Sequence, residues 1–254
     1  MKETGMQQKI RKFFTWAIIV TSIFINISWT LKATVNTNKD LPSALFFSTC
    51  LSPQSDLHTM QVFVYDSLQL EQKGLSQEAF EYAMNGFATL QNDGYLKNDS
   101  ILTIVDFDQP SYNKRLYVID IKNYKILFNT LVAHGKNSGK EWAQSFSNKA
   151  ESNKSSLGFY VTEGTYNGSN GFSLKLSGME AGLNSNAFQR AIVMHGADYV
   201  NDSYIRSQGY IGRSLGCPAV PEKLNRPIIE KIKNGSCLFI YNKSYKKTSK
   251  IFPS

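Results

Sequence analysis

Residues 101–133, ILTIVDFDQPSYNKRLYVIDIKNYKILFNTLVA, decide the fold. They contain three runs rich in Ile, Leu, Val, Phe and Tyr, at residues 101–107, 115–121 and 125–133. Runs of this length, rich in β-branched and aromatic residues, are typical of β-strands. Only a short turn sequence around Asn123 separates the second run from the third, so this pair predicts a β-hairpin.

The sequence downstream of this stretch continues in the same manner. Further strands are predicted at residues 157–166, 172–176, 190–195 and 236–241. Segments rich in Gly, Ser and Asn separate them, and such segments favour turns. We therefore expect a mainly β domain with a curved or barrel-like mixed sheet and a few flanking helices.

Two segments have a helical pattern. Residues 75–91 place their apolar side chains on one stripe, with Ser76 as the expected N-cap and residues 92–94 as the end of the helix. Residues 221–235 predict a short helix that Pro227 interrupts.

The charge distribution argues against a nucleic-acid-binding groove. The chain of 254 residues has a formal net charge of +8. Residues 1–12 carry a net +3 and residues 243–254 a net +4, which leaves +1 for the remainder. A nearly neutral body contains no large basic patch, so we expect no nucleic acid as a partner.

The N-terminus has the pattern of an export segment. A basic start is followed by an uncharged stretch of 19 residues, 13–31, which is long for a signal peptide and just long enough for a membrane span. We expect residues 1–31 to be a signal peptide or an N-terminal membrane anchor. The body would then be exported, as a periplasmic protein or one anchored in the inner membrane and facing the periplasm.

The expected organisation has four parts. They are the export segment, a linker or lead-in over residues 32–74, a folded domain over residues 75–242, and a basic tail over residues 243–254. The sequence does not predict an oligomeric state.

The chain has three cysteines, Cys50, Cys217 and Cys237, and an odd number leaves at least one thiol unpaired. Cys237 alternates within a predicted strand and is expected in the core. The sequence alone does not decide whether Cys217 and Cys237 form a disulfide. No paired Cys or His spacing predicts a metal site, and we expect no cofactor.

Residues 212–221, GRSLGCPAVP, contain the candidate nucleophile, Cys217. A cysteine reacts as its thiolate, so it needs a neighbouring group that accepts its proton. His195 ends an apolar strand 22 residues upstream and is the candidate base. Gly216 permits a tight turn that points peptide N–H groups at a substrate carbonyl.

Two residues close to Cys217 in the sequence add further functional groups to the Cys217–His195 pair. Arg213 supplies a cation that lowers a thiol pKa or binds a carboxylate, and Ser214 supplies a hydrogen-bonding group. Taken singly, Cys217 is more often a small buried apolar residue and His195 an ordinary hydrogen-bonded residue. The hypothesis of a reactive pair therefore depends on their combination.

This combination resembles the catalytic domain of YkuD-type L,D-transpeptidases, and in particular the murein L,D-transpeptidase catalytic domain-like branch. The resemblance is carried by VMHGADYV, residues 193–200, followed by GYIGRSLGCPAVP, residues 209–221. The signature of the family is His-Gly, an intervening stretch, then Ser-x-Gly-Cys. Similar segments such as LVAHGKNSG and SSLGFYVTEGTYNG extend the resemblance over about residues 75–242.

The resemblance implies roles for individual residues. Cys217 would be the nucleophile, His195 would accept its proton, and the Gly196 carbonyl would orient the imidazole. The N–H groups of Gly216 and Cys217 would form the oxyanion hole. The residues implied to bind substrate or to support the site are Arg213, Ser214, His134, Ser155 and Ser156.

One position departs from the pattern. Many L,D-transpeptidases have a histidine immediately before the Gly-Cys pair, where this chain has Leu215. Leucine cannot transfer a proton, so a role of that second histidine is absent or has moved to another residue. His134 is a candidate for that role, or it shapes the substrate cleft.

The resemblance also implies a reaction. The thiolate attacks the third residue of a murein tetrapeptide stem, releases D-alanine and leaves a thioester. Resolution by an amine gives a 3–3 crosslink, whereas resolution by water gives an L,D-carboxypeptidase. Another murein cysteine peptidase and a non-catalytic peptidoglycan-binding protein are the alternatives. The expected partners are peptidoglycan stem peptides, with membrane association through the N-terminal segment.

Overall fold

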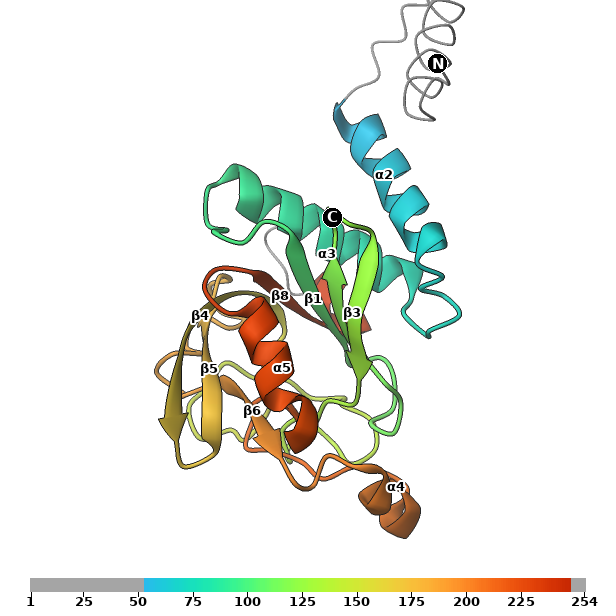
Figure 1. Ribbon diagram of the computed structural model, residues 1–254. Helices are drawn as coiled ribbons and strands as arrows, with labels where there is room; N and C mark the ends of the chain where they lie inside the picture. Colours follow the sequence, from blue (N-terminus) through green and yellow to red (C-terminus); the bar gives the residue numbers. More distant parts are fainter. Residues whose placement is uncertain (1–52, 248–254) are drawn as a thin grey trace, which may run out of the picture. The chain divides into compact units, whose positions relative to one another are not determined.

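The computed structural model describes residues 53–247 (Figure 1). The predicted export segment, Cys50 and most of the basic tail lie outside the described residues. Within residues 53–247, no helix combines the length and the apolar character that crossing a membrane requires.

Eight strands form one sheet in the order β3-β2-β1-β8-β4-β5-β6-β7. Most neighbours are antiparallel, but the pairs β1·β8 and β6·β7 are parallel, so the sheet is mixed. The strands are β1 (Ile101–Asp106), β2 (Leu116–Asp120), β3 (Lys125–Thr130), β4 (Gly158–Gly168), β5 (Gly171–Gly178), β6 (Val193–Ala197), β7 (Ala219–Pro221) and β8 (Cys237–Tyr241).

The two edges of this sheet approach each other. Ala133, three residues beyond β3, forms a bridge with Ala219 of β7, and the Ala133 N–H donates to the Ala219 carbonyl at 2.8 Å. This contact bends the sheet into a nearly closed barrel. The predicted fold class, a mainly β domain with a barrel-like mixed sheet, is confirmed.

Within residues 53–247, four helices flank the sheet: α2 (Pro53–Ser67), α3 (Gln77–Asn92), α4 (Asp202–Gln208) and α5 (Glu222–Ile232). α3 packs on β1 and β8, and α5 packs against β5, β6 and β7 (Figure 1). All six residues of β1 are buried, because elements cover both of its faces. A short 3₁₀ helix, Lys243–Lys247, ends the described part of the chain.

The cap predicted for α3 is confirmed. The Ser76 side chain accepts a hydrogen bond from the Ala79 N–H at 3.2 Å, which satisfies one of the unpaired donors of the first turn. Asp93 forms the C-cap, within the segment where the sequence predicts the end of the helix.

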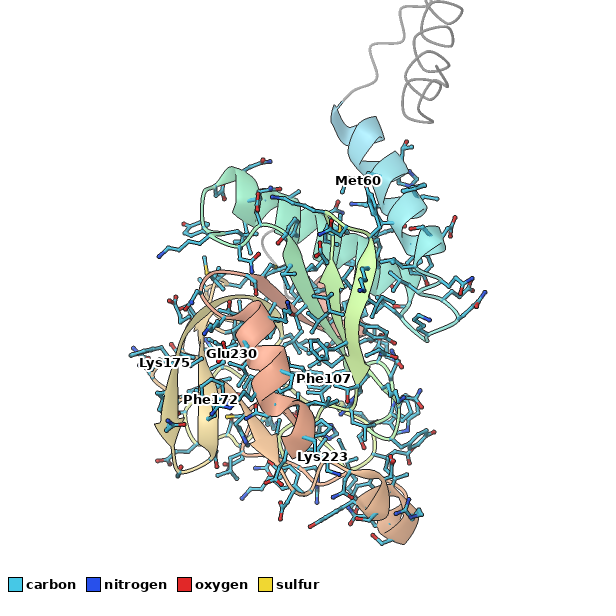
Figure 2. The ribbon with its side chains drawn as sticks, in the orientation of Figure 1. Met60, Phe107, Phe172, Lys175, Lys223 and Glu230 are labelled. Atoms are coloured by element: carbon cyan, nitrogen blue, oxygen red, sulfur yellow. The ribbon has the colours of Figure 1, made fainter. Side chains whose placement is uncertain are left out.

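α5 differs from the prediction because it runs through Pro227 without a break. Proline removes one backbone hydrogen bond from the helix. The burial of Ile228, Ile229 and Ile232 directly after it offsets this loss. The helix also contacts β5, whose Phe172 is labelled in Figure 2. The Arg226 guanidinium lies 4.0 Å from the centre of the Phe172 ring.

α2 lies inside the stretch where the sequence predicts a linker. Its Val64 is fully buried in the core, and the Tyr65 hydroxyl donates to the Leu75 carbonyl at 2.6 Å. Gln61 donates to Asn85 of α3 at 2.7 Å. The contacts that fix α2 are therefore made to α3 and the segment before it.

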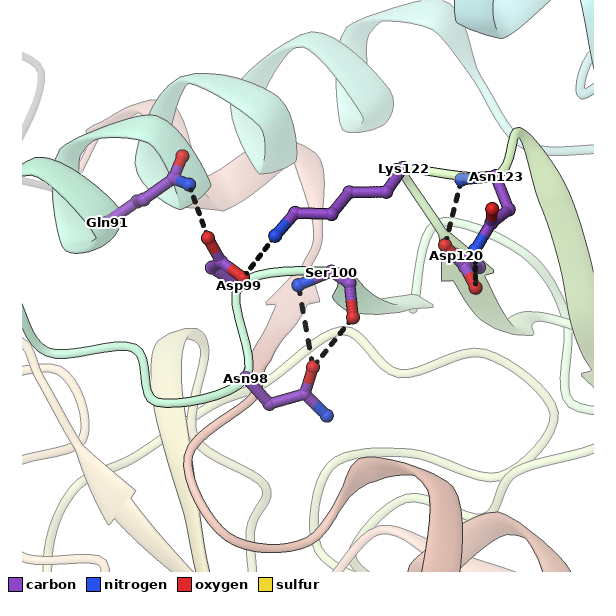
Figure 3. A network of polar contacts seen from close by, with 7 residues as sticks. All are labelled: Gln91, Asn98, Asp99, Ser100, Asp120, Lys122 and Asn123. Atoms are coloured by element: carbon purple, nitrogen blue, oxygen red, sulfur yellow. Dashed lines mark hydrogen bonds and ion pairs between the residues drawn. The ribbon is translucent and has the colours of Figure 1, made fainter.

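The hairpin predicted around Asn123 is confirmed and is tied to α3 (Figure 3). The Asp120 carboxylate accepts hydrogen bonds from the backbone and side-chain nitrogens of Asn123, both at 2.9 Å. Beside this turn, Lys122 pairs with Asp99 at 2.6 Å, and Gln91 near the end of α3 donates to the same carboxylate at 3.1 Å.

The α3–β4 contact gives a prediction for Gly86→Ala. A Cβ at position 86 would lie 2.0 Å from Cζ of the buried Phe159 ring, so the helix or the ring must move. We expect the free energy of unfolding to fall by about 1–3 kcal/mol, which overcomes the higher helix propensity of alanine. Urea titration followed by circular dichroism measures the change.

The matched control is Thr89→Ala, one turn further on the exposed side of α3. We expect its stability to stay within about 0.5 kcal/mol of the parent. A Gly86→Ala variant as stable as the parent would contradict the packing described here.

Candidate active site

The pairing of β6 with β7 brings the candidate cysteine and histidine segments together. His195 of β6 is opposite Ala219 of β7, two residues after Cys217. The Cys217 sulfur accepts a hydrogen bond from the Val193 N–H at 3.5 Å and donates to the Ala191 carbonyl at 3.7 Å. The thiol is therefore held against the backbone at the start of the strand that carries His195.

The His195 ring is oriented by a backbone carbonyl. Its Nδ1 lies 2.9 Å from the Gly196 oxygen, the contact that the resemblance implies. A carbonyl only accepts, so this contact assigns the proton to Nδ1 and leaves the lone pair of Nε2 free. Burial lowers the pKa of His195, which is only 5% exposed, so the ring is neutral at neutral pH.

The thiol is also neutral at rest. Burial raises the pKa of Cys217, and the Val193 N–H and the Arg190 guanidinium act in the opposite direction. A neutral thiol and a neutral imidazole cannot form a preformed ion pair. The thiolate must therefore be generated when the proton moves to His195, as general-base catalysis requires.

Ser214 fixes the turn in front of the nucleophile. Its hydroxyl donates to the Cys217 carbonyl at 2.6 Å and accepts from the Gly216 N–H at 3.0 Å. The Gly216 N–H, one of the two expected oxyanion donors, is thus engaged. The Cys217 N–H makes no hydrogen bond to another group of residues 53–247 and is available to a ligand.

Gly216 has a conformation that other residues rarely adopt. Its φ is +128°, and a Cβ at this position would lie 2.8 Å from the Lys154 carbonyl and 3.2 Å from Nη2 of Arg190. A side chain here would strain the backbone and displace its neighbours. The glycine therefore permits the close approach of residues 154 and 190 to the thiol loop.

Arg190 is a site residue that the sequence analysis missed. Its Nη1 donates to the Ser147 carbonyl at 2.7 Å and to the Ser156 hydroxyl at 2.5 Å. Its Nη2 donates to the Lys154 carbonyl at 2.7 Å and to the Ser152 hydroxyl at 3.2 Å. One cation thus joins the loop of residues 147–156 to the nucleophile. The sequence signal that could have identified Arg190 is its position just before the strand that carries His195.

The two serines predicted to support the site, Ser155 and Ser156, are buried, and their side chains form hydrogen bonds within the protein. Ser155 accepts from the Gly135 N–H at 3.0 Å through its hydroxyl. Ser156 donates to the Ser147 carbonyl at 2.8 Å and accepts from Arg190. These contacts shape the loop around the site.

His134 lies in the interior, away from solvent. Its Nδ1 is 2.8 Å from Nη2 of the buried Arg115, and its Nε2 is 3.3 Å from the Gly139 carbonyl. Burial and the nearby Arg115 cation lower the pKa of His134 to about 3. His134 therefore contacts the 135–139 loop through Gly139 from a fully buried position, and its role in a substrate cleft stays a prediction.

Arg213 and Leu215 flank the turn on its outer side. Nη1 of Arg213 donates to the carbonyls of Lys136 and Gly139, both at 3.1 Å, so it too anchors the 135–139 loop. Leu215 is 63% exposed. The position before the Gly-Cys pair therefore presents an apolar side chain to solvent.

Cys237 is fully buried in β8, as predicted, and both it and Cys217 are free thiols. Within residues 53–247, no three His, Cys, Asp or Glu side chains are grouped so that they could hold a metal ion.

A family model described as the L,D-transpeptidase catalytic domain matches residues 71–241. Among solved structures, an L,D-transpeptidase from Mycobacterium smegmatis is similar at 12% identity over 56% of this chain and 59% of that one, with a TM-score of 0.36. Mycobacterium tuberculosis L,D-transpeptidase 1 has 10% identity over 56% and 62%, with a TM-score of 0.32.

An L,D-transpeptidase from Stackebrandtia nassauensis has 15% identity over 83% of this chain and 98% of that one, with a TM-score of 0.34. The chain thus spans less than two thirds of each mycobacterial protein. No curated protein matches it.

The raised pKa of Cys217 gives a prediction for thiol labelling. Alkylation by iodoacetamide follows the thiolate fraction, which rises as pH passes through the pKa. We expect the labelling rate of Cys217 to reach half its maximum above pH 9.0, the ordinary value for a cysteine. Mass spectrometry of the peptides separates it from Cys237, which stays unlabelled until the protein unfolds. A plateau already at pH 7 would show a preformed thiolate.

Arg190 gives a second prediction on the same measurement. Its cation lowers the pKa of Cys217, so Arg190→Gln should move the labelling profile to still higher pH. Arg213→Gln is the matched control and should leave the profile unchanged, since Arg213 bonds to the 135–139 loop. Identical pH profiles of Cys217 labelling for the parent and both variants would show that Arg190 does not act on the thiol.

Proposed function

The chain belongs to the L,D-transpeptidase catalytic domain family, and we propose that it releases D-alanine from murein tetrapeptide stems through a thioester on Cys217. The observation that carries this proposal is the contact between His195 Nδ1 and the Gly196 carbonyl, which assigns the ring proton to Nδ1 and leaves Nε2 as a base. It provides a neutral base on the strand against which the thiol packs.

The acylation step follows from this arrangement. His195 Nε2 takes the thiol proton as the sulfur attacks the carbonyl of the third stem residue, forming a C–S bond. The Cys217 N–H donates to the oxygen on which negative charge develops. The imidazolium then returns the proton to the leaving amine, so the C–N bond breaks and D-alanine departs.

The second half of the reaction repeats these roles with a new amine. His195 removes a proton from the side-chain amine of the diamino acid of a second stem, and the amine attacks the thioester carbonyl. The C–S bond breaks, the thiol recovers its proton, and a 3–3 crosslink remains. Because murein lies outside the inner membrane, the proposal includes export through the N-terminal segment.

Cys217→Ala tests the proposal. We expect it to abolish D-alanine release from tetrapeptide muropeptides, because no other group can form the acyl intermediate. Mass spectrometry of the products measures release, and the thermal unfolding midpoint of the variant should match the parent. Cys50→Ala is the control, since residue 50 lies outside the matched region, and should keep full turnover.

The products identify the acceptor. Stem dimers indicate transpeptidation, and tripeptides without dimers indicate L,D-carboxypeptidation by water. Retained turnover in Cys217→Ala would overturn the assignment of the nucleophile, and an inactive parent would favour a peptidoglycan-binding role.

A further inference from the structure

Two adjoining cavities lie on the face formed by the segment before β4 and the end of β8. The first, of about 510 Å³, is lined by residues that include Asp108, Trp142 and Asn242. The second, of about 400 Å³, is lined by residues that include Ser147 and Asn148. Gln144 and Ser244 belong to both linings, so the two cavities adjoin, and together we call them the Trp142 groove.

The lining of the Trp142 groove combines an aromatic face with neutral amides. Trp142 is 42% exposed, although tryptophan usually buries its large apolar surface. Gln144 beside it and Asn148 in the second cavity carry amides that can make further hydrogen bonds, whereas the Asn242 amide already donates to Asp108 and accepts from Ser244. A pyranose ring has the complementary form, with an apolar C–H face and a rim of hydroxyl and acetamido groups.

The charges of the groove do not favour an ionic ligand. The Asp108 carboxylate already accepts hydrogen bonds from the Asn242 side chain at 2.7 Å and from the Lys243 N–H at 3.0 Å. Lys243 contributes one ammonium group next to this one carboxylate. The groove therefore has no excess of either sign and fits a neutral polymer.

One side chain connects the groove to the nucleophile. The Ser147 carbonyl, in the wall of the second cavity, accepts from Nη1 of Arg190 at 2.7 Å. Nη2 of the same guanidinium packs against Gly216, the neighbour of Cys217. A ligand at this end of the groove thus lies close to the thiol loop.

We propose that the Trp142 groove binds the glycan strand of the substrate, with Trp142 stacked on a sugar ring. This proposal rests on the proposed function, because stem peptides branch from a chain of N-acetylated sugars. The reacting carbonyl belongs to the third stem residue, and three extended residues span about 10 Å. The glycan of a bound stem must therefore lie within reach of the thiol, and the second cavity is linked to the thiol loop through Ser147 and Arg190.

The test measures saccharide binding without turnover. Isothermal titration of the full-length Cys217→Ala chain with the tetramer of N-acetylglucosamine should show saturable binding. Adding Trp142→Ala should raise the Kd at least about tenfold, as for other aromatic anchors in binding sites. Tyr95→Ala is the matched control, an exposed aromatic residue outside the groove, and should leave the Kd unchanged.

Trp142→Phe is a second variant that keeps an aromatic face, and it should retain part of the affinity. Thermal unfolding of all variants checks that they are folded. The absence of saturable binding in the Cys217→Ala chain would overturn the proposal, as would equal Kd values with and without Trp142. Displacement of the bound saccharide by a sugar-free tetrapeptide would place peptide in the groove and would also overturn it.

Turnover separates this proposal from the proposed function. In the chain with Cys217 intact, Trp142→Ala should lower kcat/KM for glycan-linked stems and leave kcat/KM for the free tetrapeptide unchanged. An equal loss on both substrates would overturn the glycan role. Absence of D-alanine release with saturable saccharide binding would refute the proposed reaction alone.

Discussion

Ala219 makes two contacts on which the rest of the domain depends. Its backbone pairs with His195 of β6 on one side, and its carbonyl accepts from the Ala133 N–H on the other. The first contact sets the distance between the cysteine and histidine segments, and the second closes the barrel. Because one fully buried residue makes both, the geometry of the site and the closure of the sheet depend on the same position.

The site has few charges where chemistry would occur. Burial raises the pKa of Cys217 and lowers the pKa of His195, so both groups rest in their neutral forms. Arg190 is the cation that acts to lower the pKa of the thiol. Four hydrogen bonds hold its guanidinium on the loop of residues 147–156. Its action on the thiol therefore depends on the shape of that loop.

The sequence predicts what local patterns encode, including the strands of residues 101–133 and the Ser76 cap. It also singles out Cys217 and His195, whose segments the pairing of β6 with β7 brings together, while their reaction as a pair stays a prediction. It misses β7, because three residues are too short to show an alternating pattern, and α4, which buries none of its residues. It also misses Arg190, whose partners lie 34–43 residues away and are ordinary serines and carbonyls. The engagement of the Gly216 N–H by Ser214 depends on turn geometry, which spacing alone does not specify.

The protonated resting state of Cys217 has a consequence for its durability. Peroxides and disulfides react with the thiolate and only slowly with the neutral thiol. The burial that keeps the sulfur protonated thus also protects it from oxidation. An unpaired cysteine with this environment can stay reduced where oxidants are present, and it becomes vulnerable once a base such as His195 accepts its proton.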